Sequence, residues 1–158
     1  MRRAFPVWKV FPYVAAQFAG SIIASLFVCF LSGQSDLVSR HDSFLMWQRF
    51  FAELLASFVL MLVILGTAHK HKITGSNAAI AVAFAVLAGH IIAEPISGAG
   101  MNPARTLGPA IVSGNFSDWW IYLFAPSLGA CIAVIVISIL QGACNHDERV
   151  SAEGTDAH

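Results

Sequence analysis

The segment EPISGAGMNPARTLGPAIVSG, residues 94–114, decides the fold of this chain because it sets a polar, broken stretch between two long apolar runs. Asn102 favours the N-cap of a helix and Pro103 favours its first position, so the sequence predicts a short helix continuing over residues 104–112. The start of such a helix presents unpaired N–H donors and about half a positive charge. A polar, positively polarised helix end is therefore predicted in an otherwise apolar chain.

The composition of the chain is typical of a membrane protein. Of its 158 residues, 57% are hydrophobic and 11% are charged, and the mean hydropathy is +0.70. Soluble domains carry about 25% charged residues, so a soluble fold is disfavoured. Nine basic and nine acidic residues give a formal net charge of zero, which argues against a nucleic-acid partner.

Four apolar segments are long enough to cross a bilayer, which takes about 20 residues. These segments cover residues 13–31, 47–68, 77–93 and 119–140. Residues 95–113 are too polar for a fifth span, so they are predicted to leave and re-enter the membrane on one side. The predicted fold class is an all-α membrane protein with four transmembrane helices and one re-entrant half-helix. It forms a membrane domain over residues 1–144, with a disordered cytoplasmic tail over residues 145–158.

Basic residues in the connections predict an orientation. With four spans, one side of the membrane receives Arg2, Arg3, Lys9, Lys70, Lys72 and Arg149. The other side receives Arg40 and Arg49, which Asp36 and Asp42 offset. Because positive charge is enriched in cytoplasmic connections, both termini are predicted to lie in the cytoplasm.

Polar side chains inside a membrane need partners, since charge at that depth is costly. Arg105 lies one turn inside the predicted half-helix, and His90 lies near the end of the third span, so both are predicted to face one narrow opening. The alternatives are snorkelling of Arg105 to the interface and a packing role for His90. Glu53 is predicted to accept hydrogen bonds from loop N–H groups that lack a helical partner, with a proton relay as the alternative.

The glycine-rich stretch before the half-helix, residues 98–100, is predicted to be an extended strand with outward-facing carbonyls. A row of carbonyl acceptors that leads to a positive helix end suits the passage of small, neutral, polar molecules. The same arrangement repels protons and cations.

Two motifs carry a resemblance to a known family. SGAGMNPARTLGPAI and the later WWIYLFAPSLGA resemble the second half of a major intrinsic protein, the aquaporin and aquaglyceroporin family. The opening RRAFPVWKVFPYVAAQFAGSIIAS is similar to the third helix of that family, especially in the plant nodulin-26-like branch, and the likeness covers residues 2–141. The family fold is an inverted repeat in which two Asn-Pro-Ala turns meet at mid-membrane. The resemblance therefore implies an N-terminally truncated member, whose first two spans and first triplet would lie before Met1.

The resemblance also assigns roles to individual residues. In the triplet Asn102-Pro103-Ala104, the Asn102 amide would donate to the passing solute. The resemblance places Arg105, His90 and Ala99 at selectivity-filter positions, and Glu53 at a buried glutamate that orients the loop around Gly98 and Gly100. A His-Arg pair resembles water-selective filters, whereas nodulin-26-like members usually have an aliphatic or small residue at position 90. The positions that separate water from glycerol channels would be Thr106, Ala110, Tyr122 and Leu123, with Ala110 of the water type and Leu123 of the glycerol type.

The predicted function is a passive channel for water that extends to small neutral solutes such as glycerol and metalloid acids. The resemblance implies a homotetramer with one pore per subunit, placed in the plasma membrane. The alternative is a non-conducting paralogue that assembles with full-length subunits, as a hetero-tetramer, and regulates them. An enzyme is disfavoured, because the sequence shows no nucleophile–base pair or phosphate-binding loop, and no cofactor is expected. Cys29, Cys131 and Cys144 lack metal-ligand spacing, and the first two are predicted to be core thiols.

Overall fold

The computed structural model describes residues 6–34, 37–38, 43–67 and 76–141 as an all-helical protein. Its elements are α1 (Val7–Ser32), α2 (Met46–Thr67), α3 (Ser76–Ser97), α4 (Pro103–Ser113) and α5 (Trp119–Gln141). Four of these helices are long and apolar enough to cross a membrane, and α4 is the short exception. The predicted fold class is therefore confirmed. The predicted tail over residues 145–158 lies outside the described residues.

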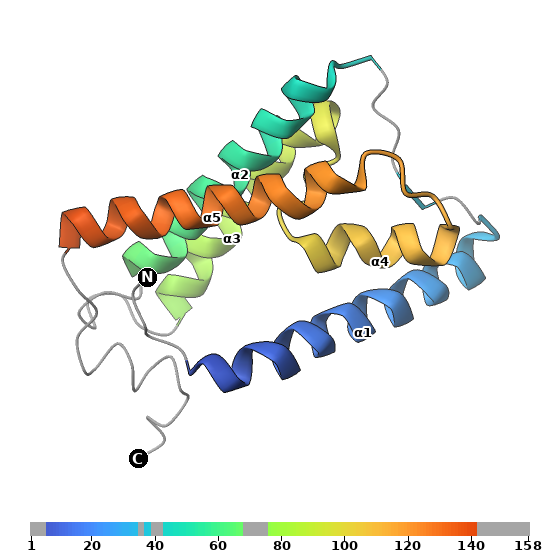
Figure 1. The fold of residues 1–158 in the computed structure, drawn as a ribbon, viewed down its shortest axis with the longest axis horizontal. Helices are drawn as coiled ribbons and strands as arrows, with labels where there is room; N and C mark the ends of the chain where they lie inside the picture. Colours follow the sequence, from blue (N-terminus) through green and yellow to red (C-terminus); the bar gives the residue numbers. More distant parts are fainter. Residues whose placement is uncertain (1–5, 35–36, 39–42, 68–75, 142–158) are drawn as a thin grey trace.

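The long helices alternate in direction, and α4 doubles back among them (Figure 1). The start of α1 and the end of α5 lie toward the same side of the molecule, as four crossings require. The chain leaves α3 at the opposite side, returns toward the middle, and runs outward again as α4 before α5 begins. With 11 residues, α4 is about 16 Å long, roughly half of a hydrocarbon core. This is the geometry of a re-entrant half-helix.

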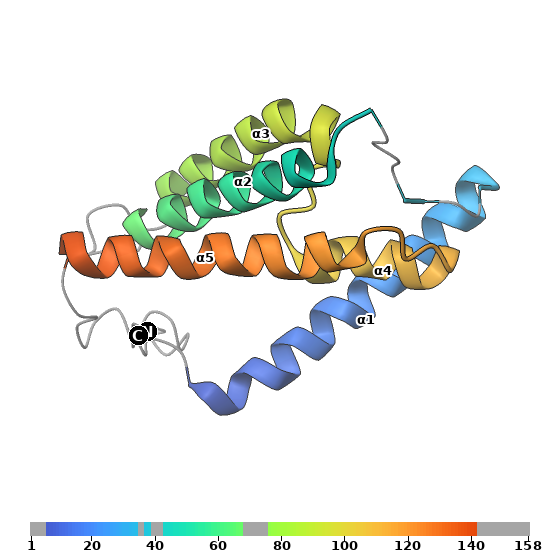
Figure 2. The same ribbon diagram turned by 45° about the horizontal axis from the view of Figure 1, so that its top comes forward.

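The helices form two groups that α4 connects. In one group α2 packs against both α3 and α5, while α1 contacts only α4 among the described helices. Because α4 also packs against α5, it lies between the two groups, which Figure 2 shows from a second direction. One side of α4 thus faces a three-helix group, and the other side faces a single helix.

Two glycines mark the closest helix crossings. A Cβ at Gly129 of α5 would overlap the carbonyl oxygen of Leu54, so α5 lies directly against the backbone of α2. A Cβ at Gly108 of α4 would likewise overlap the side chain of Ser21 on α1. Small residues allow such close approach, and close packing is what joins helices in lipid, where the hydrophobic effect between them is absent.

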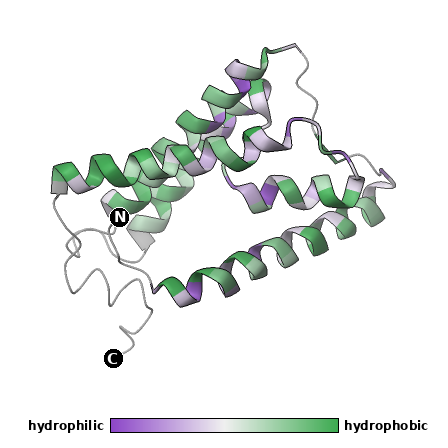
Figure 3. Ribbon diagram, in the orientation of Figure 1, coloured by the Kyte–Doolittle hydropathy of each residue, from purple (hydrophilic) through white to green (hydrophobic). Residues whose placement is uncertain are grey.

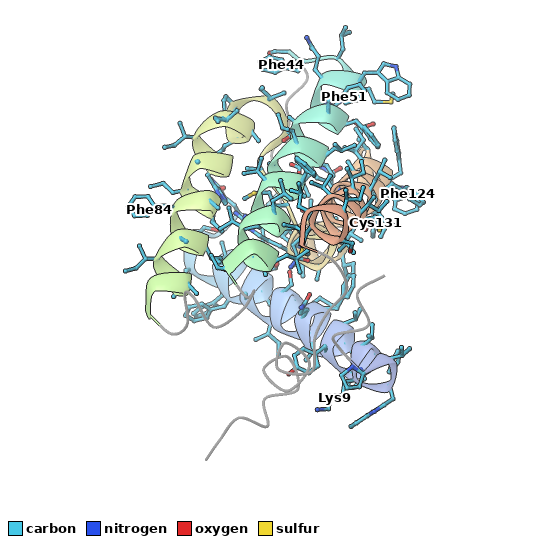
Figure 4. The ribbon with its side chains drawn as sticks, turned by 90° about the vertical axis from the view of Figure 1, so that its left-hand side faces the viewer. Lys9, Phe44, Phe51, Phe84, Phe124 and Cys131 are labelled. Atoms are coloured by element: carbon cyan, nitrogen blue, oxygen red, sulfur yellow. The ribbon has the colours of Figure 1, made fainter. Side chains whose placement is uncertain are left out.

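Large apolar side chains cover the outside of the molecule. Figure 3 shows hydrophobic residues along the long helices, and Figure 4 shows Phe84 of α3 and Phe124 of α5 pointing outward on opposite sides. In a bilayer these side chains meet lipid or other helices. Cys131 is exposed on α5, so the prediction that it is a core thiol is wrong. Cys29 on α1 is half-buried. An outward position is as apolar as a core when lipid is the solvent.

Two helices are longer than the sequence predicts. The first starts at Val7 instead of residue 13 and contains Pro12, and the third runs to Ser97 instead of residue 93 and contains Pro95. Proline removes one backbone donor, but membrane helices tolerate this loss when neighbouring groups satisfy the freed carbonyl. Past Pro95, the N–H of Gly98 still donates to the carbonyl of Glu94 at 2.9 Å, so the last turn of α3 is kept.

Candidate functional site

The loop between α3 and α4 has an unusual backbone. Gly98, Ala99 and Met101 have φ angles of 85°, 47° and 51°, all in the left-handed region. The extended strand predicted for residues 98–100 is therefore wrong. Left-handed backbone is costly for alanine and methionine, by about 1–2 kcal/mol per residue, so other contacts must stabilise it.

The Glu53 carboxylate of α2 supplies those contacts from a fully buried position. Its Oε1 accepts hydrogen bonds from the Ser97 hydroxyl at 2.7 Å and from the Gly100 N–H at 2.8 Å. Its Oε2 accepts from the Met101 N–H at 2.8 Å. Hydrogen bonds to an ionised carboxylate are about twice as strong as neutral ones. Left-handed turns aim the loop N–H groups at this carboxylate, and these are the bonds that the sequence predicts for Glu53.

Close packing fixes the same loop from the other sides. The Tyr122 hydroxyl of α5 donates to the carbonyl of Ser97 at 2.7 Å. A Cβ at Gly100 would overlap the Thr106 hydroxyl and would lie 3.2 Å from a ring carbon of Tyr122. Only glycine therefore fits at position 100 without displacing its neighbours.

Met101 anchors the loop in the group formed by α2 and α3. Its side chain is buried with Ala93 and Ala99, and Ala52, Ala56, Leu60 and Val86 pack around this cluster. A Cβ at Gly89 would lie 2.8 Å from the Met101 sulfur, so the gap at Gly89 admits the thioether. Sequence reasoning missed both Met101 and Ser97, because nothing in their spacing distinguishes them from other apolar-segment residues.

The start of α4 has the predicted cap. Asn102 is the N-cap, its side-chain oxygen accepts from the Ala104 N–H at 2.9 Å, and Pro103 occupies the first turn. Since the Asn102 oxygen is engaged, its amide hydrogens remain to bind other acceptors. The helix covers Pro103–Ser113, so it begins at the predicted first position and ends one residue beyond the predicted residue 112.

Arg105 bends back onto the loop. Its Nη1 donates to the carbonyl of Ala99 at 3.0 Å, while the residue as a whole stays exposed. Among the described residues no carboxylate pairs with Arg105. Within the described residues its partner is neutral, so the guanidinium adds a positive charge one turn after the positive end of α4.

Two openings meet at Arg105. A cavity of about 170 Å³ is lined by Leu37, Val38, Ser97, Gly98, Gly100, Arg105, Thr106, Pro109 and Tyr122. A groove of about 490 Å³ between α1 and α4 is lined by Gln17, Ser21, Ala24, Ser25, Val28, Leu37, Asn102, Ala104, Arg105 and Pro109. Leu37, Arg105 and Pro109 line both openings, so they mark the junction.

Sequence reasoning missed the polar residues that α1 contributes to the groove, Gln17, Ser21 and Ser25. Their spacing of four residues on one helix face was the available signal.

Four of the predicted filter and solute-class residues line neither opening. The His90 Nδ1 is 2.8 Å from the carbonyl of Val86, and in the described part of the chain no hydrogen bond joins His90 to Arg105. The two linings do not include His90, Ala99, Ala110 or Leu123, and Ala99 is fully buried. Ala110 is buried and Leu123 is half-buried. Their roles in solute selection stay predictions.

An ion pair ties the beginnings of α2 and α5 together. Arg49 Nη1 lies 2.8 Å from Asp118 Oδ2, and the two side chains are 13% and 28% exposed. The pair neutralises Arg49 beside the first turn of α5.

Within the described residues, no group of three His, Cys, Asp or Glu side chains comes together as metal ligands would.

The fold and the site together define an integral, multi-pass membrane protein with a polar re-entrant half-helix. The chain belongs to the major intrinsic protein family, whose family model matches residues 1–137. It is similar to Nodulin-26 of Glycine max, at 40% identity over 88% of this chain and 52% of that protein. It is also similar to Probable aquaporin NIP4-2 of Arabidopsis thaliana, at 40% identity over 80% of this chain and 46% of that protein.

A third relative, Aquaporin NIP3-1 of Oryza sativa subsp. japonica, is 43% identical over 81% of this chain and 42% of its own length. The predicted likeness to the nodulin-26-like branch is confirmed by these names. The chain spans about half the length of the curated relatives it matches.

Proposed function

We propose that the chain forms one wall of a passive membrane channel for water, extending to small neutral solutes such as glycerol and metalloid acids. One observation carries the proposal. The Arg105 guanidinium is held on the Ala99 carbonyl where the cavity and the groove meet, one turn from the capped end of α4. The relatives named as aquaporins point to the same activity.

A passing water molecule first meets the cavity beside Gly98, Gly100 and Arg105. Its oxygen accepts from the guanidinium and then, farther in, from the Asn102 amide hydrogens. The positive end of α4 attracts that oxygen, so each water molecule changes its orientation as it passes. This change interrupts the chain of hydrogen bonds along which protons would move. The charge of Arg105 raises the barrier for cations and protons, while neutral molecules pass.

Selection among neutral solutes rests on the residues around this path. In this proposal Ala99 and His90 are filter residues, with His90 reaching the path in the assembled pore. Pro103 and Ala104 complete the triplet, and the solute class is set by Thr106, Ala110, Tyr122 and Leu123.

The assembly we propose is a homotetramer in the plasma membrane, with both termini in the cytoplasm and a pore in each subunit. No cofactor or chemical step is required for passive transport.

Osmotic shrinking of liposomes that contain the purified chain tests the proposal. We expect faster water flux than in empty liposomes, and Arg105→Val should raise the cation or proton leak while water flux persists. The matched control is Lys9→Gln, which removes a positive charge from α1 at a residue outside the groove lining. A conducting protein whose leak is unchanged by Arg105→Val would remove Arg105 from its proposed role.

The alternative function, a non-conducting subunit that regulates full-length channels, is favoured by one specific observation. The groove between α1 and α4 leaves Arg105 exposed beside polar side chains, and polar groups at membrane depth must be covered by protein or water. Co-expression with a full-length relative tests this function. It predicts co-purification, altered surface abundance of the relative, and no flux from the chain alone; measurable flux from the chain alone contradicts it.

A further inference from the structure

Ser97, the last residue of α3, is the centre of a buried hydrogen-bond network. It is 1% exposed, and its carbonyl accepts from the Tyr122 hydroxyl at 2.7 Å. Its own hydroxyl lies 2.7 Å from Glu53 Oε1 and 3.1 Å from the carbonyl of Ala93. The N–H of Ala99 donates to the same hydroxyl oxygen at 3.4 Å.

The hydroxyl of Ser97 has one hydrogen to donate and two lone pairs to accept. The shorter contact and the charged acceptor direct that hydrogen to Glu53. A lone pair is then left for the N–H of Ala99. The serine thereby joins the carboxylate of α2 to the residue whose carbonyl holds Arg105.

Ala99 needs a stabilising hydrogen bond of this kind because of its backbone conformation. Its φ of 47° is unfavourable for an L-amino acid, and its side chain is fully buried, so its backbone has little space for other orientations. The Ala99 carbonyl shares a peptide plane with the Gly100 N–H, which donates to Glu53 Oε1 at 2.8 Å, so the oxygen that Ser97 orients also sets the direction of this carbonyl. That carbonyl is the hydrogen-bond acceptor for the Arg105 guanidinium at 3.0 Å.

We propose that Ser97 is a positioning residue that sets the direction of the Ala99 carbonyl, and with it the place of the Arg105 guanidinium at the junction of the two openings. Tyr122 shares this role through its hydroxyl, which holds the Ser97 carbonyl. The significance of this network for solute selection rests on the proposed channel function; its effect on Arg105 does not.

This role is separable from general support of the loop. Glu53 holds the N–H groups of Gly100 and Met101 directly, at 2.8 Å each. Removal of the Ser97 hydroxyl keeps Glu53 as the acceptor of those two bonds, but it takes away both the donor that orients Oε1 and the partner of the Ala99 N–H. The loop therefore stays on α2, while the peptide plane that carries the Ala99 carbonyl loses the support of Ser97, and Arg105 becomes more mobile with it.

Hydrogen exchange of the Arg105 guanidinium, followed by ¹⁵N NMR of the full chain in lipid nanodiscs, tests the proposal without any need for flux. The Arg105 signal is assigned from its loss in Arg105→Lys. We expect Ser97→Ala to speed exchange by about threefold to tenfold, and Tyr122→Phe to act in the same direction by less. Ser138→Ala is the matched control, because among the described residues its half-buried hydroxyl bonds the Val134 carbonyl of its own helix alone.

Unchanged guanidinium exchange in both Ser97→Ala and Tyr122→Phe would overturn the proposal, as would an equal change in Ser138→Ala. If Ser97→Ala does not fold, Tyr122→Phe decides, because it removes one oxygen and keeps the ring.

Flux in liposomes adds a second measurement. We expect Ser97→Ala to raise the ratio of cation leak to water flux by about threefold to tenfold in the natural background and to add nothing in Arg105→Val. Additive effects would contradict action through Arg105. A chain that shows no flux at all contradicts the proposed channel function alone, and the NMR result still decides the role of Ser97.

Discussion

The two sides of the re-entrant segment differ in how their polar groups are satisfied. On the side of α2 and α5, Glu53, Ser97 and Tyr122 pair the loop's polar groups within a buried core. On the side of α1, Asn102 and Arg105 line an open groove whose far wall carries Gln17, among other residues. One side is closed by protein and the other is left open.

The closed side therefore supports the loop, whereas the open side offers polar groups to molecules that enter the groove. Buried polar groups that are fully paired give a rigid support, because breaking any one bond leaves an unpaired group. Polar groups that stay open at the same level of the fold remain available for molecules that enter. The closed side therefore fixes the loop so that the open side can present Asn102 and Arg105 at fixed places.

Removal of the central carboxylate should break the closed side most severely. We expect Glu53→Ala to lower the free energy of unfolding by about 3 kcal/mol or more, because two loop N–H groups and the Ser97 hydroxyl lose their acceptor. Titration of the detergent-solubilised chain with SDS, followed by tryptophan fluorescence, measures the loss. Glu94→Ala, at an exposed carboxylate of α3, is the control. Equal stability of the two variants would contradict the scaffold role.

The close approach at Gly100 gives the next largest effect. Gly100→Ala should lower the free energy of unfolding by about 1–3 kcal/mol, since the added methyl overlaps Thr106 and crowds Tyr122. The same SDS titration measures it.

Gly20→Ala on α1 is the matched control, because a Cβ there meets nothing within 4 Å. This second variant should keep or raise stability by about 0.5–1 kcal/mol through helix propensity. A loss at Gly20 as large as the loss at Gly100 would contradict the contrast between the closed and open sides.

The ion pair at the edge of the closed side should have the smallest effect. Asp118→Asn keeps a residue type that tolerates the φ of 53° at this position. We expect a loss of about 0.5–1 kcal/mol at low salt, because both partners are only partly covered. Added salt should shrink the difference. Stability that does not change with Asp118→Asn at low salt would show that the pair adds nothing to the α2–α5 contact.

The sequence predicts those parts of the molecule whose causes are local. The Asn102 cap and the Pro103 start of α4 follow from neighbouring residues, and the four spans follow from apolar length. The left-handed loop could not be predicted, because neither Ala99 nor Met101 favours that backbone. The cause is a carboxylate 47 and 48 positions earlier in the chain.

The remaining differences have the same origin. Pro95 predicts a helix end by its local geometry, but the structure continues α3 to Ser97, where contacts from α2 and α5 hold the last turn. The polar face of α1 was likewise missed, because its meaning depends on α4 lying opposite. Long-range contacts decide these features, and short sequence patterns do not contain them.

The proposed channel requires that the groove between α1 and α4 is filled with water and not with lipid. Ala24 lines the groove, whereas its neighbour Ile23 is 67% exposed and does not line it. In a background with Cys29, Cys131 and Cys144 replaced by alanine, Ala24→Cys and Ile23→Cys are compared for reaction with a charged methanethiosulfonate reagent in lipid nanodiscs. Thiolate formation requires water, so we expect Ala24→Cys to react about tenfold faster or more than Ile23→Cys. Equal rates, or faster reaction at Ile23→Cys, would contradict it.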